Sequence, residues 1–424
     1  MIQRISAQQR AELRTGSSSF GSDNSDHASV DAPDHASVDA PDLASVDAPA
    51  FCADIEKLKA EFEGTANHDD FRHLKKIERF GRLFSILGFA TAWIIPNPLS
   101  AFFIQMGIAT RFLLLHMISH GGYDGIPGIP KRYTSKHFAL GWRRYVDCFE
   151  WWPAETWHRQ HNELHHYYTG EGTDPDTLER HGRFFRDLKA PKSIKRLFIF
   201  LFGVTWKYTV YAPNSMSVFD PKTKAAIKPE DIKYLTFKSI FKFRNRSVRE
   251  LWTSSYLPYV GFHFVLIPLL FVPIGWTAVL FVFLNRLLAE FMTNLHGALV
   301  IFANHAGDDL YSLKFHYRNK EEFYVTQVVS STNYRTGTEF VDYMSMWLNY
   351  QIEHHLFPRL PMLKYRQIQP RVKAICEKHG VPYRQESIFK RGRRAFEFLD
   401  GKTDLPELWT LERPDSSPAS PPTR

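Results

Sequence analysis

The stretch WTSSYLPYVGFHFVLIPLLFVPIGWTAVLFVFLN, residues 252–285, runs for 34 positions without Asp, Glu, Lys or Arg. A helix that crosses a bilayer needs roughly 20 mostly apolar residues, so this stretch is too long for a single crossing. Pro273-Ile274-Gly275 interrupts it, and proline lacks a backbone donor and favours a turn. We therefore predict two membrane helices, over 252–272 and 276–298, that cross and return.

A second uncharged stretch, residues 83–110, is broken by Pro96-Asn97-Pro98 in the same way. It predicts a second helical hairpin over 76–95 and 99–119. The alternative reading is that these are buried helices of a soluble protein, but two long uncharged stretches favour the membrane. The predicted fold is therefore an all-α integral membrane protein with four transmembrane helices in two hairpins.

Charged residues within the predicted spans need special placement. Arg79 and Arg82 would have to extend to the membrane edge. Arg286 and Glu290 lie in the last span, so they should face protein or an internal cavity rather than lipid.

The distribution of positive charge predicts the orientation of the chain. The loop 121–250 contains 23 Lys and Arg residues, and the two turns between the paired spans contain none. Because basic residues accumulate on the cytoplasmic side, we place the termini, this loop and the segment after residue 300 there as a helical cap. The net charge of +8 suits a surface lying against anionic lipids, and no nucleic-acid-binding motif is recognisable.

The two ends of the chain have the composition of disordered tails. Residues 26–49 hold three copies of an eight-residue acidic, proline-containing repeat, which cannot bury enough apolar surface to offset chain entropy. We predict a disordered tail over 1–50, a folded membrane domain over 51–408 and a second disordered tail over 409–424. Within the domain, segment 187–212 mixes apolar and basic residues and predicts a helix lying in the membrane interface.

Eight histidines gather in four groups that flank the apolar stretches. Histidine is the commonest metal ligand because the neutral imidazole offers a lone pair without adding charge. The candidate metal ligands are His116, His120, His161, His165, His166, His305, His354 and His355. The topology predicted above places all four groups on one side of the membrane, so they can share a site.

The spacing of these histidines indicates two metal ions. Residues four apart lie on one face of a helix, so His116 and His120 can aim at one centre, and so can His161 and His165. Adjacent histidines point in different directions, and each adjacent pair could supply one ligand to each metal. Such ligands suit Zn, Fe, Mn or Cu. Eight are too many for one catalytic zinc, which uses about three.

Two further metal-site classes do not fit the sequence. The zinc-hydrolase HExxH motif is absent. Carboxylate-bridged di-iron helix bundles need two ExxH motifs, and only Glu163 with His166 provides one within a histidine group. Two imidazole-bound irons that activate O2 remain, and the membrane location suggests a lipid C–H bond as the substrate.

These groups resemble the three histidine boxes of the membrane fatty acid desaturase superfamily, over roughly residues 75–400. His116 and His120 match box one, and His161, His165 and His166 match box two. In box three, Gln351 stands in the place of the first histidine before His354 and His355. This form is similar to the front-end acyl desaturases, and His305 matches the extra histidine after the fourth span.

The resemblance implies an enzyme that uses two irons and O2 to insert a cis double bond into a long acyl chain, carried as an acyl-lipid or acyl-CoA. The His-Pro-Gly-Gly motif of a fused cytochrome b5 domain is absent. We therefore expect a separate electron donor, a ferredoxin or a cytochrome b5 with its reductase. The alternatives are a related di-iron hydroxylase or a sphingolipid or carotenoid modifier, and a non-catalytic or zinc-binding membrane protein that kept the boxes for structural reasons.

Several non-histidine residues are candidates for roles beside the metals. Gln351 could orient a ligand or a water molecule, and Asn304 could hold a metal-bound water or cap a helix. Asp308 and Asp309 could accept from the N–H groups of ligand imidazoles. The remaining histidines are treated as background, with His158 and His296 the nearest to joining the site.

Overall fold

The computed structural model describes residues 43–411, and this part of the chain is mostly helical. Most of the two predicted tails, 1–42 and 412–424, lies outside the described residues. Helix α2 begins at Ala48, shortly before the predicted start of the folded domain at residue 51. Asp47 caps this helix, because its carboxylate accepts a hydrogen bond from the Ala50 N–H group.

Within the described residues, α-helices dominate and short π and 3₁₀ turns connect them. The α-helices are α2 (Ala48–Phe62), α3 (His68–Ala92), α4 (Pro98–Ser119), α5 (Ala154–Trp157), α6 (His166–Tyr168), α7 (Leu178–Arg186), α8 (Lys192–Gly203), α9 (Ala212–Met216), α10 (Arg246–Leu251), α11 (Leu257–Val260), α12 (Ile267–Leu269), α13 (Trp276–Ile301), α14 (Lys320–Val329), α15 (Glu339–Met344), α16 (Gln351–Leu356), α17 (Met362–Lys378) and α18 (Ile388–Asp400). The π-helices are η4 (His158–His165), η5 (Lys207–Tyr211), η7 (Trp252–Tyr256) and η8 (Gly261–Leu266). The 3₁₀ turns are η1 (Leu43–Ser45), η2 (Lys131–Tyr133), η3 (Gly141–Tyr145), η6 (Pro229–Asp231), η9 (Phe302–Asn304) and η10 (Leu348–Tyr350).

Four two-residue strands complete the described elements. They are β1 (Ser312–Leu313), β2 (Asn333–Tyr334), β3 (Gln385–Glu386) and β4 (Glu407–Leu408). They form two parallel pairs, β1 with β4 and β2 with β3. In register, Ser312 is opposite Glu407 and Asn333 is opposite Gln385. These pairs tie the last part of the described chain to the segments around the third histidine group.

All four predicted hairpin helices form as helical segments. Two of them, Pro98–Ser119 and Trp276–Asn304, are long and apolar enough to cross a membrane. Helix α3 is not among these two, because its first half carries many charged residues that lower its mean hydropathy. The run from α10 to α12 is divided by the π turns η7 and η8. Pro258 and Pro268 lie inside this continuous helical run, since the residues before α11 and α12 are already helical, and the missing proline N–H groups interrupt the regular hydrogen-bond ladder.

Helices α3 and α4 pack closely as an antiparallel hairpin. A Cβ atom on Gly88 would lie 2.6 Å from Ile104 Cγ1 and 2.8 Å from the Ile104 backbone nitrogen, so a side chain at this position would force the helices apart. The turn between them is held by Asn285 of α13, whose amide donates to the carbonyls of Ala92 and Ile95. The third long helix is therefore joined to the turn of the first hairpin.

Helix α13 carries a buried ion pair that the sequence analysis required to face protein. Arg286 donates to Glu290 at 2.9 Å and to the Tyr259 hydroxyl at 2.8 Å, and the Trp151 indole donates to the other Glu290 oxygen at 2.7 Å. Arg286 has no exposed surface and Glu290 only 2 %. The predicted inward placement of both charges is confirmed.

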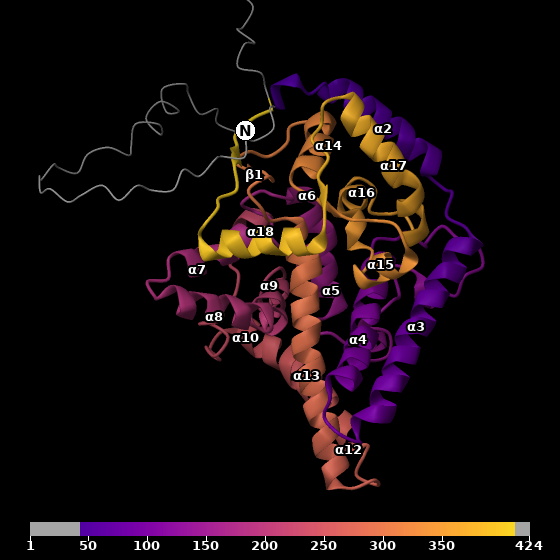
Figure 1. Cartoon of the computed structure of the whole chain (residues 1–424), viewed down its shortest axis with the longest axis vertical. Coiled ribbons are helices and arrows are strands. Elements are labelled where there is room, and N and C mark those ends of the chain that lie inside the picture. Colours follow the sequence, from indigo (N-terminus) through magenta and orange to yellow (C-terminus); the bar gives the residue numbers. More distant parts are fainter. Residues whose placement is uncertain (1–42, 412–424) are drawn as a thin grey trace, which may run out of the picture. The chain divides into compact units, whose positions relative to one another are not determined.

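Figure 1 shows α3, α4 and α13 running toward one end, where α12 also lies, while α2, α14, α16 and α17 gather at the other end. Helix α2 is held against α17 by ion pairs, including Asp54 with Lys378 and Glu61 with Arg371. Helix α18 covers the end of α13, because Arg391 donates to the carbonyls of Ala303 and Ala306.

The predicted interfacial helix corresponds to α8, Lys192–Gly203. Leu197, Phe198, Phe200 and Leu201 are all more than 40 % exposed although they are apolar. Their exposure is consistent with the predicted interface position.

Candidate metal centre

All eight predicted histidines meet in one buried region, where their nitrogen atoms form two adjoining groups. The five-histidine group consists of His116, His120, His161, His166 and His354, and the three-histidine group consists of His165, His305 and His355. In each group one ligand atom per residue lies within 4.8 Å of all the others. The rings of His166 and His355 stack at 4.5 Å and bring the two groups together.

Helix α4 supplies the first pair of histidines from a regular α-helical turn. His116 and His120, four residues apart, both belong to the five-histidine group, as the spacing predicted. The Nε2 atom of His116 lies 3.0 Å from the Nε2 atoms of both His161 and His354. Three segments that are far apart in the sequence therefore direct the same ring nitrogen at one point.

The second histidine box lies on a π-helix, and this changes which residues share a face. Over His158–His165 the backbone forms i→i+5 bonds, including one from the His166 N–H group to the His161 carbonyl. The wider turn brings His166, rather than His165, into the five-histidine group beside His161. The prediction that His161 and His165 serve one centre, which assumed an α-helix, is corrected to this extent. The two still adjoin and lie with Asp176 in a third potential ligand set.

The adjacent histidines of the third box, His354 and His355, belong to different groups, which is one of the arrangements that the sequence analysis allowed. Both residues lie in the short helix α16, where neighbouring side chains point about 100° apart. His354 reaches the five-histidine group and His355 the three-histidine group. His305 follows η9 at the end of α13 and completes the smaller group.

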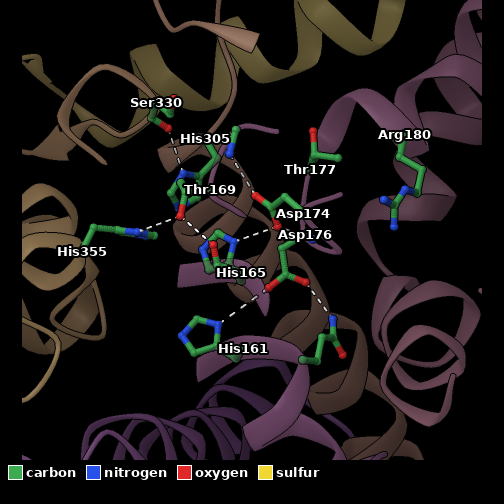
Figure 2. A network of polar contacts seen from close by, with 12 residues as sticks. His161, His165, Thr169, Asp174, Asp176, Thr177, Arg180, His305, Ser330 and His355 are labelled. Carbon is green, nitrogen blue, oxygen red and sulfur yellow. Dashed lines mark hydrogen bonds and ion pairs between the residues drawn. The ribbon is translucent and has the colours of Figure 1, made fainter. Parts of the chain in front are cut away.

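Polar partners behind the rings fix their orientation. In Figure 2, His165 Nδ1 lies 3.0 Å from an Asp174 oxygen, and His305 Nδ1 lies 3.0 Å from the Ser330 carbonyl. His355 Nδ1 contacts the side-chain Oε1 atom of Gln327 at 2.9 Å and the Thr169 hydroxyl at 3.1 Å. His354 Nδ1 contacts the Tyr365 hydroxyl at 3.2 Å. With Nδ1 engaged in this way, Nε2 is left to face the centre, which is the usual arrangement around histidine-bound metals.

Burial keeps most of these imidazoles neutral. Burial, with neighbouring histidines adding to it, lowers the pKa of His120, His161 and His166 well below the ordinary value. Burial likewise lowers the pKa of His305 to about 3. A neutral imidazole retains the lone pair that a metal needs, so the environment favours metal binding over protonation.

The pKa values of the two carboxyl groups beside box two, Asp174 and Asp176, are shifted in opposite directions. Burial opposes a charge on His165, but the negative charge and hydrogen bond of Asp174 raise the pKa of His165. Burial also opposes ionisation of Asp174, but its pKa is lowered because His165 offers positive charge and a hydrogen bond. Burial, with repulsion from Asp174, raises the pKa of Asp176 to about 6. This pair therefore holds one firm negative charge next to the smaller histidine group.

Unsatisfied ring nitrogens test whether the site fits a metal. The Nε2 atom of His120 and both ring nitrogens of His166 are buried and have no hydrogen-bond partner among the described residues. A buried polar atom without a partner is costly unless something else binds it. Both residues belong to the five-histidine group, so bound metal would satisfy the atoms that the protein leaves without partners.

A cavity adjoins both groups and has a polar wall and an apolar wall. The polar wall includes His116, His161, His165, His305 and Gln351. The apolar wall comprises Phe112, Trp157, Tyr211, Ile301, Phe302 and Leu348. The cavity has a volume of about 20 Å³, room for about one water molecule, so it brings apolar side chains and histidines together around a small space.

Comparison with known proteins identifies the family to which these histidine groups belong. The family model described as "Fatty acid desaturase" matches residues 87–387, more than half of the chain and all eight histidines. The chain belongs to the fatty acid desaturase family. The resemblance predicted from the histidine boxes is confirmed.

Individual relatives of the family match over shorter stretches. The chain is 34% identical to an acyl-lipid (8-3)-desaturase of Rebecca salina over 111 residues, 26% of each chain. It is 34% identical to an acyl-lipid (9-3)-desaturase of Physcomitrium patens over 116 residues, 27% of this chain and 19% of the relative. A match to fatty acid desaturase 3 of Bos taurus reaches 57% identity over 44 residues, 10% of each chain. These matches span about a quarter or less of the relatives' length, and no solved structure matches.

The two residues predicted to assist the metals lie together at the smaller group. The Gln351 amide nitrogen lies 2.9 Å from His305 Nε2 and 3.0 Å from His355 Nε2, so this side chain takes a place among the ligand atoms. Asn304 donates to the side-chain Oε1 atom of Gln351 at 3.0 Å and to the backbone carbonyl of Leu348 at 3.0 Å. Asn304 therefore holds Gln351 and does not itself reach a histidine.

Other candidates lie away from the family's histidine site. Asp309 forms an ion pair with Arg391, and Asp308 pairs with Arg394, so the prediction that they accept from ligand imidazoles is wrong. The guanidinium groups of Arg391 and Arg394 bind these carboxylates in place of the imidazoles. Both arginines lie in α18, more than 80 residues later in the sequence, so the pairing could not be predicted from local patterns. His296 contacts Gln105 and the Met344 carbonyl, and His158 is not in either histidine group.

Sequence reasoning missed most of the outer partners. Asp174 and Asp176 follow box two closely in a Thr-Asp-Pro-Asp run, which was a visible signal. Gln160 directly precedes box two and donates to Asp176 at 2.7 Å. The block around Gln327 to Thr332 resembles family sequence, but the sequence indicated no partner role for Gln327 or Ser330, because α14 reaches the site through its packing on α16.

Proposed function

We propose that this chain is an O2-dependent fatty acid desaturase that inserts a cis double bond into a long acyl chain. The observation that carries the proposal is the pair of buried histidine groups facing an apolar-walled cavity. The relatives named above are called acyl-lipid desaturases, which supports a lipid-borne acyl chain as the substrate.

Two irons fit the donor set that the site presents. The five-histidine group would hold one iron, and His165, His305 and His355 would hold the other, with Gln351 beside them. Such a pair would supply the activation of O2 and the removal of hydrogen from an unactivated methylene group. Overall, one CH2–CH2 unit, O2, two electrons and two protons become one CH=CH unit and two water molecules.

The protein's own contribution is to position the chain and exclude water. Phe112, Ile301 and Leu348 line the same cavity as His116 and His305. The space is about 20 Å³, so these side chains would have to move apart to admit a methylene pair, which would then displace water from the reacting region. Holding the reacting groups in a fixed orientation can lower a barrier substantially, so the packing of this wall should control which carbon pair reacts.

The proposed setting is a membrane with the histidine site on the cytoplasmic side. We propose four spans in two hairpins, a catalytic domain over residues 51–408, and electrons from a separate ferredoxin or from cytochrome b5 with its reductase. In support, apolar residues near the turns of both hairpins are strongly exposed, among them Ile95 (58%), Leu270 (67%) and Trp276 (71%). Reagents that label engineered cysteines from one side of sealed vesicles would test this topology.

The proposed activity is tested by gas chromatography–mass spectrometry of total acyl chains from a host that expresses the chain, beside His355→Ala. The intact protein should yield a new unsaturated acid, and His355→Ala should reduce it below detection while still accumulating in the membrane. His158→Ala is the matched control, because His158 is a neighbouring histidine outside both groups, and it should retain product. A new hydroxy acid in place of the unsaturated acid would instead favour a hydroxylase.

A further inference from the structure

The segment from Lys233 to Arg249, called here the basic-aromatic segment, has an unusual composition. It contains six basic residues and no acidic residue, and leads through α10 into the apolar stretch that begins at Trp252. The basic residues are Lys233, Lys238, Lys242, Arg244, Arg246 and Arg249. Nothing in the metal site uses this segment.

Three aromatic residues alternate with these charges and point outward. Phe237 is 56% exposed, Phe241 58% and Phe243 50%. The rings of Phe241 and Phe243 lie 6.0 and 5.6 Å from the Trp252 ring, so they form a patch with the start of the apolar stretch. Clustered exposed apolar rings on a folded protein mark a surface that another component covers.

The exposure of these rings is not the result of a loosely attached loop. Leu235, Ile240 and Val248 of the same segment are buried. The Trp252 indole donates to the Ile240 carbonyl at 2.8 Å, and the Leu235 N–H group donates to the Ser217 hydroxyl at 2.9 Å. The fold thus anchors the segment through its aliphatic residues and leaves the phenylalanines outside.

Most of the positive charges are available to a partner. The side chains of Lys238, Lys242, Arg244 and Arg246 are exposed and make no hydrogen bond or ion pair with any residue in the described part of the chain. By contrast, Lys224 pairs with Glu250 directly after the segment. The positive charge of the segment is therefore not neutralised by the protein itself.

We propose that the basic-aromatic segment is a docking surface for the anionic phospholipid headgroups of the cytoplasmic leaflet. Basic side chains attract anionic headgroups, and aromatic rings beside them enter the boundary between headgroups and acyl chains. An acidic protein could also match the charge, but the continuity of the rings with the apolar stretch at Trp252 favours a lipid surface. The inference rests on the membrane placement proposed above.

The test uses the full chain purified in detergent and two fluorescent lipids in mixed micelles. Labelled phosphatidylglycerol carries a negative charge, whereas phosphatidylcholine with the same label has no net charge. Energy transfer from tryptophan to the label reports binding. Phosphatidylglycerol should bind about tenfold more tightly, and added salt should reduce the difference because it screens exposed charges.

Two double variants, each of which removes two positive charges, test whether the lipid preference arises from the basic-aromatic segment. Lys242→Gln with Arg244→Gln should reduce the preference for phosphatidylglycerol about tenfold, since each basic residue near an anionic surface contributes severalfold. Lys57→Gln with Arg335→Gln, two exposed positions in α2 and after β2, should leave the preference unchanged. Equal binding of both lipids by the intact chain, or equal losses in the two variants, would overturn the proposal.

This assay needs neither metal nor O2, so its outcome is separate from that of the desaturase test. If the intact chain prefers phosphatidylglycerol but makes no double bond, the proposal of a docking surface stands and the proposed activity fails. If it makes the double bond but shows no lipid preference, only the docking surface fails. Binding of neither lipid would contradict both the docking surface and the membrane placement.

Discussion

His165 has a carboxylate oxygen, from Asp174, 3.0 Å from its Nδ1 atom, whereas the carboxylate beside His161 Nδ1, that of Asp176, lies 3.7 Å away. Asp174 accepts from this ring, and it also accepts from the N–H groups of Gly170 and Asp176 at 3.1 and 2.8 Å. The carboxylate is thus fixed by the backbone around it before any metal binds. Groups of this kind orient a metal-binding ring and increase its basicity.

The first prediction concerns this carboxylate. Asp174→Asn should lower metal affinity at the three-histidine group by about 10–100-fold, the usual effect of losing such a partner. Metal content after equilibrium dialysis against a series of free iron concentrations measures the change. Asp308→Asn removes an equally charged group that contacts Arg394 rather than a histidine, so its iron affinity should match that of the intact chain. An equal decrease in both variants would exclude a specific role for Asp174.

At the scale of single residues, the sequence predicted the histidines better than their partners. The eight ring positions follow from spacing because HxxxH and HH patterns are rare by chance. The partners Gln327 and Ser330 are ordinary polar groups whose role exists only where α14 meets α16. Asp308 and Asp309 show the converse error, since they lie close to His305 in sequence but turn toward α18.

At the scale of elements, the π-helix η4 determines how box two is divided. A π turn contains one residue more than the α turn it replaces. Sequence patterns do not reveal this, because HxxxHH suits an α-helix equally well. The structure places His161 and His166 in one group through the extra residue between them.

Insertion of one alanine after Asn162 therefore provides the second prediction. A single π turn takes up one extra residue and not two, so the insertion should rotate His165 and His166 by about 100° relative to His161. We expect loss of iron and of product, measured by elemental analysis and by acyl-chain profiling. Asn162→Ala retains the residue count and loses only the amide donation to the Ser119 carbonyl, so it should keep most of its iron. Full iron content in the insertion variant would contradict the importance of the π turn.

The third prediction concerns the attachment of α2 to α17. Asp54 accepts hydrogen bonds from His379 and Lys378, and these, His379 first, lower the pKa of Asp54 to about 2 from an ordinary value of 3.8. A carboxyl with a lowered pKa stabilises the fold above its unfolded pKa, and the contribution disappears as pH falls through the folded value. Docking of α2 should therefore hold down to about pH 4 and weaken toward pH 2.

Hydrogen exchange of the α2 amides, corrected for the intrinsic effect of pH, measures this docking. Asp54→Asn should increase exchange at neutral pH and flatten the acid dependence between pH 4 and pH 2. Glu61→Gln removes an exposed ion pair with Arg371 between the same two helices and should have a smaller effect at neutral pH. An acid dependence that is unchanged in Asp54→Asn would contradict the assignment.

At the scale of the whole molecule, the metal site joins segments from across the described chain. The histidines come from α4, from the π-helix with α6, from the end of η9 and from α16. Metal that binds the native arrangement more strongly than the unfolded chain stabilises the fold. Each such ion therefore acts as a cross-link between distant parts of the sequence.

Removal of metal should lower thermal stability. Chelation of the iron-loaded chain in detergent should reduce the melting temperature by about 5 °C or more, and re-addition of iron should restore it. Differential scanning fluorimetry measures the shift. His161→Ala should melt near the temperature of the chelated protein and respond little to the chelator, whereas His158→Ala should respond as the intact chain does. A chelator effect of equal size in both variants would argue against the assigned ligands.

Much of the architecture could be predicted from sequence. The four hairpin helices and the inward placement of Arg286 and Glu290 followed from hydropathy and the cost of buried charge. The arrangement of the cap did not, because α2, α17 and α18 are held by ion pairs between residues far apart in the chain. Local patterns contain no information about such pairs.

The wide separation of box one and box three has a consequence for synthesis on the ribosome. His116 and His354 touch across 238 positions of sequence. At about 5–20 residues per second, translation needs on the order of ten to fifty seconds to cover that distance. The first two boxes are thus synthesised long before the third, and the complete set of eight histidines does not exist during that interval. The early histidines reach their partners only after the last helices have been made.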